Sequence, residues 1–219
     1  MNPRFLPVGD AAVLIELGRQ IDAATNRRVQ MLDAWLRSGQ PAGVVELVPA
    51  YASLLIHYDP LVLSFAEVRD WADERIAGAR RIVTARPRRF EVAVRYGGAD
   101  GPDLQSVAAL HNLTAEEAAR IHASRDYTVY MMGFTPGFAY LGTLDESIAA
   151  PRLQSPRTQV PAGSVGITGL QTGIYPIESP GGWQLIGRTS VRLFDPQSEQ
   201  PFALAPGDTV RFVIEALNA

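Results

Sequence analysis

Glycine and proline are concentrated between residues 133 and 187 of this 219-residue chain. The segment holds 10 glycines and 6 prolines in 55 positions, a density that by itself would suggest disorder. Aromatic side chains and short aliphatic runs are spread through the same segment, so large apolar groups are available to fix its turns to a core. The pattern therefore predicts a β-rich domain with long, ordered loops.

The composition is that of an ordinary globular protein and removes several kinds of chemistry. Hydrophobic residues make up 47% and charged residues 20%, and the net charge is −3, which does not favour binding to nucleic acid or to an anionic membrane. Cysteine and lysine are both absent, which excludes disulfides, Schiff bases and a Walker-type phosphate loop. The first residues lack an apolar leader, so the expected location is the cytoplasm.

The first 84 residues predict a compact α+β domain with the order βαββαβ of a ferredoxin-like sandwich. In order, the expected elements are strand 11–17, helix 22–38, strands 44–48 and 53–58, a helix capped by Ser64, and a last strand at 82–84 or 90–95. The arginine-rich segment 80–89 is short and has no interleaved aromatics, so it is interpreted as a linker rather than a nucleic-acid patch. The predicted domains are residues 1–84 and 85–219.

The second domain is expected to begin with a strand and two short helices before the glycine-rich segment. The helices are predicted at 103–110 and after Thr114, whose T-x-x-E pattern is that of a capping box. Closing strands are predicted at 191–195 and 209–215 from their apolar patterns. This domain therefore reads as mainly β.

Three local motifs have weak catalytic interpretations. The glycine-rich run 163–173 lacks the strand–loop–helix context of a dinucleotide site, which favours turns. Ser164 lies in a variant nucleophile-elbow pattern with no helix after it, which favours a hydrogen-bonding role. The histidines His57, His111 and His122 show no metal-ligand spacing, so no metal site is predicted. His122, just before the glycine-rich segment, is the preferred functional candidate.

Charge placement gives the most informative signal. Between residues 147 and 190 the charged side chains are Arg152, Arg157, Glu178 and Arg188, a net charge of +2 in a chain of −3. Arginines without acidic neighbours in the sequence are candidates for binding carboxylate or phosphate. They can equally cap loop carbonyls, and both interpretations stay open. The loop from residue 175 to residue 183 is typical of a ligand pocket or a protein interface.

Four runs carry a resemblance to a known family: YGGADGPDL (96–104), YMMGFTPGFAYLG (130–142), the segment 151–189, and PGDTVRF (206–212). The chain resembles allophanate hydrolase subunit 1, a family that includes the B-type subunit of 5-oxoprolinase and the Kip-type inhibitor of a sporulation kinase. The resemblance spans the whole chain. It implies an α+β protein with an N-terminal ferredoxin-like α/β sandwich and a C-terminal cyclophilin-like β-barrel.

The resemblance also implies an activity and partners. The chain would be one subunit of an ATP-dependent 5-oxoprolinase that hydrolyses 5-oxo-L-proline to L-glutamate, and would be inactive alone. Its partners would be a homologous second subunit, similar to allophanate hydrolase subunit 2 or the C-type subunit of 5-oxoprolinase, and a third, lactam-utilisation subunit. The first two would form a carboxyltransferase-like module. ATP, with or without Mg²⁺, would be the co-substrate.

On this basis, three groups of residues are assigned candidate roles. Proton transfer is expected from His122, Tyr127 and Tyr130. Binding of a carboxylate or phosphoryl anion is expected from Arg152, Arg157, Arg188, Gly163, Ser164, Gly166, Gly169 and Gln171. A pocket or interface is expected from Phe134, Pro136, Phe138, Tyr140, Tyr175, Pro180 and Trp183.

Other functions remain open from the sequence. The chain could be a non-catalytic binding protein that inhibits a sensor histidine kinase, or a urea- or allophanate-related carboxyltransferase half-module. Prolyl isomerase activity would rest on analogy with the cyclophilin fold alone. A Ser-Ser-Lys amidase is excluded because the chain has no lysine.

Overall fold

The computed structural model describes residues 3–78 and 87–218. The chain divides into two compact units, Met1–Arg86 and Pro87–Ala219, and each is described by itself. The boundary predicted after residue 84 lies outside the described residues.

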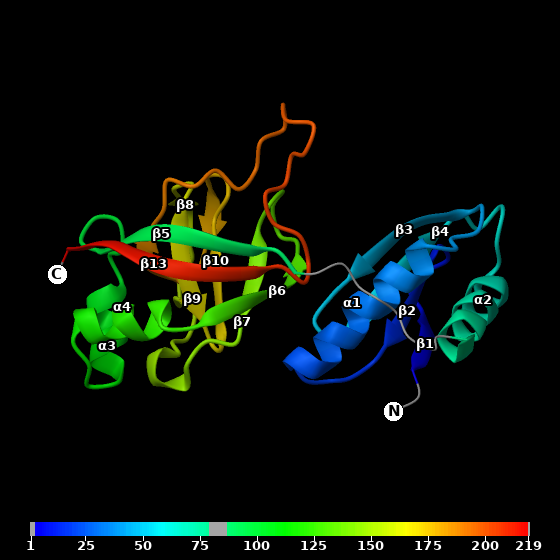
Figure 1. The fold of residues 1–219 in the computed structure, drawn as a ribbon, viewed down its shortest axis with the longest axis horizontal. Helices are drawn as coiled ribbons and strands as arrows, with labels where there is room; N and C mark the ends of the chain where they lie inside the picture. The colour runs from blue at the N-terminus through cyan, green and yellow to red at the C-terminus, as the bar shows by residue number, and fades with distance from the viewer. Residues whose placement is uncertain (1–2, 79–86, 219) are drawn as a thin grey trace. The chain divides into compact units, whose positions relative to one another are not determined.

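The N-terminal unit is an antiparallel sheet with two helices packed on it (Figure 1). Its elements are β1 (Arg4–Pro7), β2 (Ala12–Glu16), α1 (Ala23–Arg37), β3 (Val44–Pro49), β4 (Ser53–Tyr58) and α2 (Phe65–Gly78). The strand order is β1-β2-β4-β3, which is that of a ferredoxin-like sandwich whose last strand has moved to the start of the chain. The predicted order βαββαβ is thus corrected to ββαββα. Residues 82–84 lie outside the described part, and 90–95 belong to the second unit.

Local sequence signals explain where both helices of this unit begin. The carboxylate of Asp22 accepts hydrogen bonds from the amides of Ala24 and Thr25 and so caps α1. Ser64 and Glu67 form the reciprocal bonds of a capping box before α2. Alternate side chains of β2 and β4 then face the helices. The resulting core comprises Val13, Ile15, Leu17, Val29, Leu32, Leu36, Val44, Leu47, Leu54, Ile56, Tyr58, Val68 and Ala72.

The C-terminal unit is a closed barrel with the strand order β10-β7-β6-β13-β5-β12-β9. Its strands are β5 (Arg89–Gly97), β6 (Asp126–Met132), β7 (Ala139–Gly142), β9 (Ser164–Thr168), β10 (Gln171–Ile174), β12 (Gln184–Arg188) and β13 (Thr209–Asn218). The barrel closes where its first and last strands, β5 and β13, pair in parallel (Figure 1). A separate ribbon of β8 (Arg157–Val160) and β11 (Ser179–Gly181) completes the sheet structure.

Two short helices pack against the barrel and share its core. They are α3 (Leu104–Leu110) and α4 (Ala115–Ala123), and η1 (Glu146–Ile148) is a short 3₁₀ turn beside them. Thr114 and Glu117 form the predicted capping box of α4. Apolar side chains of both helices join those of the barrel interior in one cluster. None of the helices in residues 3–78 and 87–218 is long and apolar enough to cross a membrane.

The segment between β12 and β13 projects from the barrel as an arm, residues 193–203 (Figure 1). The amide of Ala203 donates to the carbonyl of Leu193, and the rings of Phe194 and Phe202 stack with centroids 5.3 Å apart. The strand predicted at 191–195 is therefore wrong, because only an isolated bridge between Phe194 and Phe202 forms there. The strand predicted at 209–215 is confirmed as part of β13.

Candidate functional site

His122 is fully buried inside the barrel unit and has two hydrogen-bond partners. Its Nε2 lies 2.8 Å from Oγ1 of Thr172, and its Nδ1 lies 2.7 Å from the hydroxyl of Tyr96. Thr172 gives its only hydroxyl proton to the carbonyl of Gly166, so it accepts from Nε2–H and Nδ1 accepts from Tyr96. Burial lowers the pKa of His122 to about 3. The ring is therefore neutral and hydrogen-bonded at both nitrogens within the core, and its predicted role in proton transfer stays a prediction.

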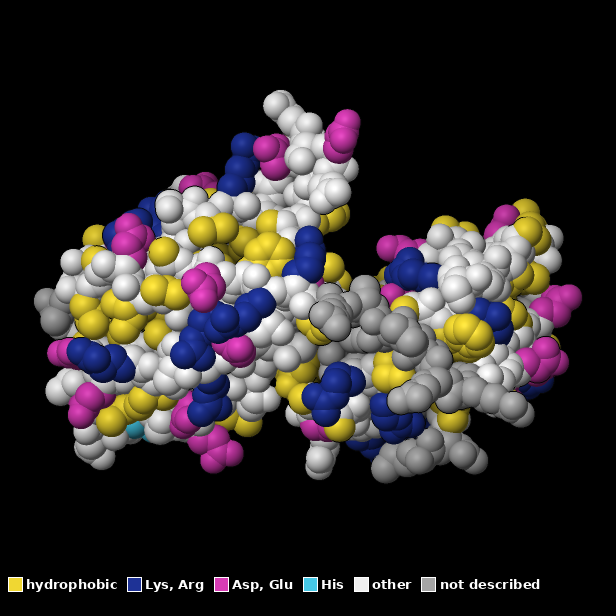
Figure 2. Space-filling view, viewed as in Figure 1, with side chains coloured by type: hydrophobic (Ala, Val, Ile, Leu, Met, Phe, Trp, Pro, Cys, Tyr) yellow, Lys and Arg dark blue, Asp and Glu magenta, His cyan; other side chains and the backbone are white. Residues whose placement is uncertain are grey.

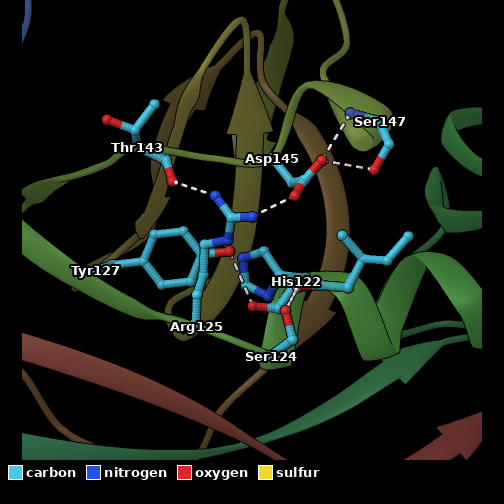
Figure 3. Close-up of polar contacts among 8 residues, drawn as sticks. His122, Ser124, Arg125, Tyr127, Thr143, Asp145 and Ser147 are labelled. Carbon is cyan, nitrogen blue, oxygen red and sulfur yellow. Dashed lines mark hydrogen bonds and ion pairs between the residues drawn. The ribbon is translucent and has the colours of Figure 1, made fainter.

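The two tyrosines grouped with His122 lie in different surroundings. The hydroxyl of Tyr127 donates to the backbone carbonyl of His122 at 2.8 Å (Figure 3), and burial raises its pKa well above the ordinary value. Beside them Arg125 binds the carboxylate of Asp145 (Figure 3). Tyr130 packs over Gly142, where an added Cβ would come within 2.5 Å of its ring. The structure therefore brings His122 and Tyr127 together, but not as an open proton-transfer site.

The buried imidazole makes stability depend on pH. Its pKa is about 3 in the folded state against 6.5 for the free side chain, so between these values the unfolded chain binds a proton that the folded chain excludes. Stability therefore falls as the pH drops below about 6.5, by up to about tenfold in the folding constant per pH unit. Replacing His122 with glutamine keeps a donor for Thr172 and an acceptor for Tyr96 but cannot titrate.

The expected result is that the urea midpoint of the wild type drops more steeply than that of His122→Gln between pH 7 and pH 5. All other titrating groups are shared by the two proteins, so they cancel in the comparison. Parallel profiles would show that the ring is hydrated or charged in the folded state.

The three candidate arginines do not form one clamp. Arg157 is bound by the buried carboxylate of Asp103, at 2.7 and 2.9 Å. Arg152 is exposed. Burial raises the pKa of Tyr140 and of Tyr175, and the positive charge of Arg152 acts on both in the opposite direction. The Nε of Arg188 donates to the carbonyl of Ala162 at 2.9 Å. The charge of Arg157 is thus already compensated by a carboxylate 54 positions earlier in the chain, so this arginine is not free to bind an anion.

The glycines predicted to bind an anion through their amides take part in the hydrogen bonding of the sheet and its turns. The amides of Gly163 and Gly169 donate to the carbonyls of Tyr175 and Ala150, and Gly166 lies within β9, paired on both sides. These amides are therefore engaged within the sheet and its turns, and the predicted anion binding by these glycines stays a prediction. Ser164 is buried at the start of β9, and Gln171 begins β10.

Gly166 and its cross-strand partner Gly173 instead make room for an aromatic cluster on the outside of the barrel. A Cβ on Gly173 would lie 3.0 Å from the ring of Phe138 and 3.2 Å from that of Trp183. The cluster consists of Phe138, Tyr140, Tyr175 and Trp183, in edge-on contacts with centroids 4.9 to 5.9 Å apart. Phe138, Tyr175 and Trp183 are almost fully buried, so the cluster anchors the loops. Pro180 is exposed on β11.

Two hollows lie next to each other at the base of the arm. The apolar hollow, about 510 Å³, is lined by Met132, Gly133, Phe134, Thr135, Pro136, Gly137, Phe202, Leu204, Ala205 and Pro206. The charged hollow, about 640 Å³, is lined by Ala162, Gly163, Pro176, Ile177, Glu178, Arg188, Thr189, Ser190, Val191, Arg192, Phe194 and Pro196. Gly137 of the first lies against Phe194 and Pro176 of the second. This region is the candidate functional site.

The site gathers four of the predicted residues: Phe134, Pro136, Gly163 and Arg188. Phe134 is 60% exposed and adopts a positive φ of 65°, a backbone conformation that is uncommon for a bulky residue. Sequence reasoning missed Phe202, because the only element predicted in this segment was a strand at 191–195, which ends before that residue. It also assigned no role to Glu178, although the charge count named it.

The face formed by β5 and β13 is a poor candidate for anion binding. Figure 2 shows positive and negative side chains interleaved there. Arg89 and Arg211 both approach Asp126, at 3.2 and 3.4 Å, and Arg95 pairs with Asp100 at 2.9 Å. Its positive charge is therefore compensated locally.

The chain combines an α/β sandwich with a closed barrel against which two short helices pack. The chain belongs to the family described as carboxyltransferase domain, subdomain C and D, whose model matches residues 3–204. It is 44% identical over 216 residues to a Bacillus subtilis protein named as the B-type subunit of 5-oxoprolinase, an alignment that covers 94% of this chain and 90% of that protein.

Solved structures share the fold. TTHA0988 matches with a TM-score of 0.82 at 38% identity over 93% of this chain, which spans only 39% of the TTHA0988 chain. The urea amidolyase of K. lactis matches with a TM-score of 0.79 at 21% identity, over 98% of this chain and 15% of the enzyme. The last likeness concerns the fold alone.

Proposed function

We propose that this chain is a subunit of a 5-oxoprolinase that hydrolyses 5-oxo-L-proline to L-glutamate with ATP. The observation that carries the proposal is the 44% identity to the B-type 5-oxoprolinase subunit of Bacillus subtilis over nearly the full length of both proteins. The proposed partners are the homologous second subunit and a lactam-utilisation subunit. The urea amidolyase likeness, at 21% identity, does not favour a urea-related function over this one.

The chemistry explains why such a subunit would need partners. Amide resonance makes the lactam a poor electrophile, and transfer of a phosphoryl group to its oxygen would create a leaving group and open the carbon to water. Such a step requires anion binding and positioning more than a protein nucleophile. In the described residues, the glycine amides predicted for phosphate are engaged by carbonyls. The proposal therefore assigns the nucleotide site to a partner subunit and inactivity to the isolated chain.

Reconstitution tests the proposal. Co-expression with the second and third subunits is expected to yield a complex whose ATP hydrolysis depends on 5-oxo-L-proline and releases glutamate in equal amount. The two partners without this chain serve as the control and are expected to lose the coupled activity. Full activity in that control would overturn the proposal. So would a complete complex whose ATP hydrolysis does not depend on 5-oxo-L-proline. Adding urea, allophanate or a sensor histidine kinase to the same preparation tests the functions left open by the sequence.

A further inference from the structure

The charged hollow contains one cation that is held in place without being neutralised. Arg188 ends β12, where its backbone pairs with Arg95 of β5 and Ser164 of β9. Its Nε donates to the carbonyl of Ala162 at 2.9 Å, which fixes the plane of the guanidinium group. Within residues 3–78 and 87–218 no carboxylate forms an ion pair with it. Its two terminal amino groups therefore remain donors for an anion.

The second arginine of the hollow is compensated. Arg192 forms an ion pair with Asp195 at 3.0 Å, and its Nε lies 3.3 Å from the carbonyl of Phe194. Asp195 and Phe194 both belong to the arm. Of the two guanidinium groups in this hollow, Arg188 is thus the one whose charge is available.

The same hollow also contains an uncompensated anion. Glu178 is exposed and lines it together with Arg188, yet among the described residues it forms no ion pair with Arg188 or any other cation. Pro176 and Val191 supply apolar walls, and Ser190 supplies a hydroxyl. A cation and an anion that share a hollow without pairing suit a ligand that carries an acceptor for one and a donor for the other.

We propose that the charged hollow binds a small amino-acid-type carboxylate. Its carboxylate would accept hydrogen bonds from the terminal amino groups of Arg188, its N–H or ammonium group would donate to Glu178, and its ring or chain would lie on Pro176 and Val191. This inference rests on the proposed function and deepens it, since 5-oxo-L-proline carries a carboxylate and a lactam N–H, and L-glutamate a carboxylate and an ammonium group. The hollow, at about 640 Å³, is larger than either molecule, so a ligand fills only part of it.

Titration of the full chain with 5-oxo-L-proline and with L-glutamate, followed by amide NMR shifts, tests the site. Shifts are expected at Glu178 and Arg188 and not around the apolar hollow. Arg188→Ala is expected to weaken binding about tenfold or more, and Glu178→Gln about threefold to tenfold. Arg192→Ala is the matched control, because that arginine lines the same hollow but is already paired, and it is expected to change binding less than about twofold. 2-Pyrrolidinone, which lacks the carboxylate, is expected not to bind measurably.

Arg188→Lys keeps the charge but loses the planar fork, so it guards against a folding defect in the alanine variant. Binding that is unchanged in both Arg188 variants, or equal for 2-pyrrolidinone, would overturn the inference.

Kinetics of the reconstituted complex separate this inference from the proposed function. A complex that is active, with a KM for 5-oxo-L-proline about tenfold higher in Arg188→Ala, supports both. If the complex is active but Arg188→Ala changes neither KM nor kcat, the proposed binding site is wrong and the proposed function is still supported. An inactive complex together with Arg188-dependent binding of L-glutamate overturns the function and leaves the site standing.

Discussion

Replacement of Asp103 by alanine is expected to lower the free energy of unfolding of the barrel unit by about 3 kcal/mol. The carboxylate of Asp103 accepts two hydrogen bonds from Arg157 and one, at 2.6 Å, from the amide of Leu185, while its own amide donates to the carbonyl of Leu185 at 2.9 Å. Removing the carboxylate leaves the half-buried guanidinium group of Arg157 without its counter-ion, with only a long bond of 3.4 Å to the carbonyl of Trp183, and leaves the buried amide of Leu185 without this acceptor. The cost of those orphaned groups dominates the effect.

Denaturant unfolding followed by Trp183 fluorescence measures this loss, since Trp183 is the single tryptophan of the second unit. Asp103→Asn keeps an acceptor for Leu185 and is expected to lose less stability than the alanine variant. Glu116→Ala, which breaks an exposed pair with Arg120, is the control and is expected to change stability little. Equal effects of Asp103→Ala and Glu116→Ala would contradict the argument.

Replacement of Gly101 by alanine is expected to destabilise the same unit by about 3 kcal/mol or more. The added Cβ would lie 2.1 Å from the carbonyl oxygen of Ile186 and 2.3 Å from its carbonyl carbon. Both atoms are backbone atoms of β12, so no side-chain rotation relieves the clash, and the strand must move away from the turn before α3. That movement also separates Asp103 from Leu185.

Gly78→Ala is the matched control for this substitution. Gly78 ends α2, has none of the described residues within 4 Å of an added Cβ and does not have a positive φ, so alanine is expected to leave stability unchanged or raise it slightly. Urea unfolding of both variants compares them directly. A Gly101→Ala variant as stable as Gly78→Ala would mean that the turn and β12 are not in contact in solution.

Short-range signals in the sequence located most of the elements. The side chains of Ser64 and Thr114 begin their helices as expected, because a cap and its partner are three residues apart. β1 was missed because it is four residues long and ends in Pro7, and proline usually argues against a strand. It is tolerated there because β1 is an edge strand that pairs only with β2.

The candidate site was harder to predict because its contacts join residues distant in sequence. Arg157 looked unpaired because no acidic residue lies near it in the sequence. Its partner Asp103 is separated from it along the chain by α3, α4, β6, β7 and η1. His122 was selected for its place just before the glycine-rich segment, whereas the hydroxyls of Tyr96 and Thr172 that hydrogen-bond both its ring nitrogens come from β5 and β10. The composition showed the positive charge of the segment correctly, and of its three arginines Arg188 lines the charged hollow.

The parallel pairing of β5 with β13 has a consequence for biosynthesis. These strands are joined through nine residue pairs, from Arg89 with Thr209 to Gly97 with Asn218, so the barrel cannot close until β13 has left the ribosome. All described helices and strands of the sandwich unit, from β1 to α2, precede β5 in the chain, so this unit can fold while the barrel is still being translated. A nascent chain stalled before residue 209 should therefore expose the apolar lining of an open barrel to chaperones and proteases.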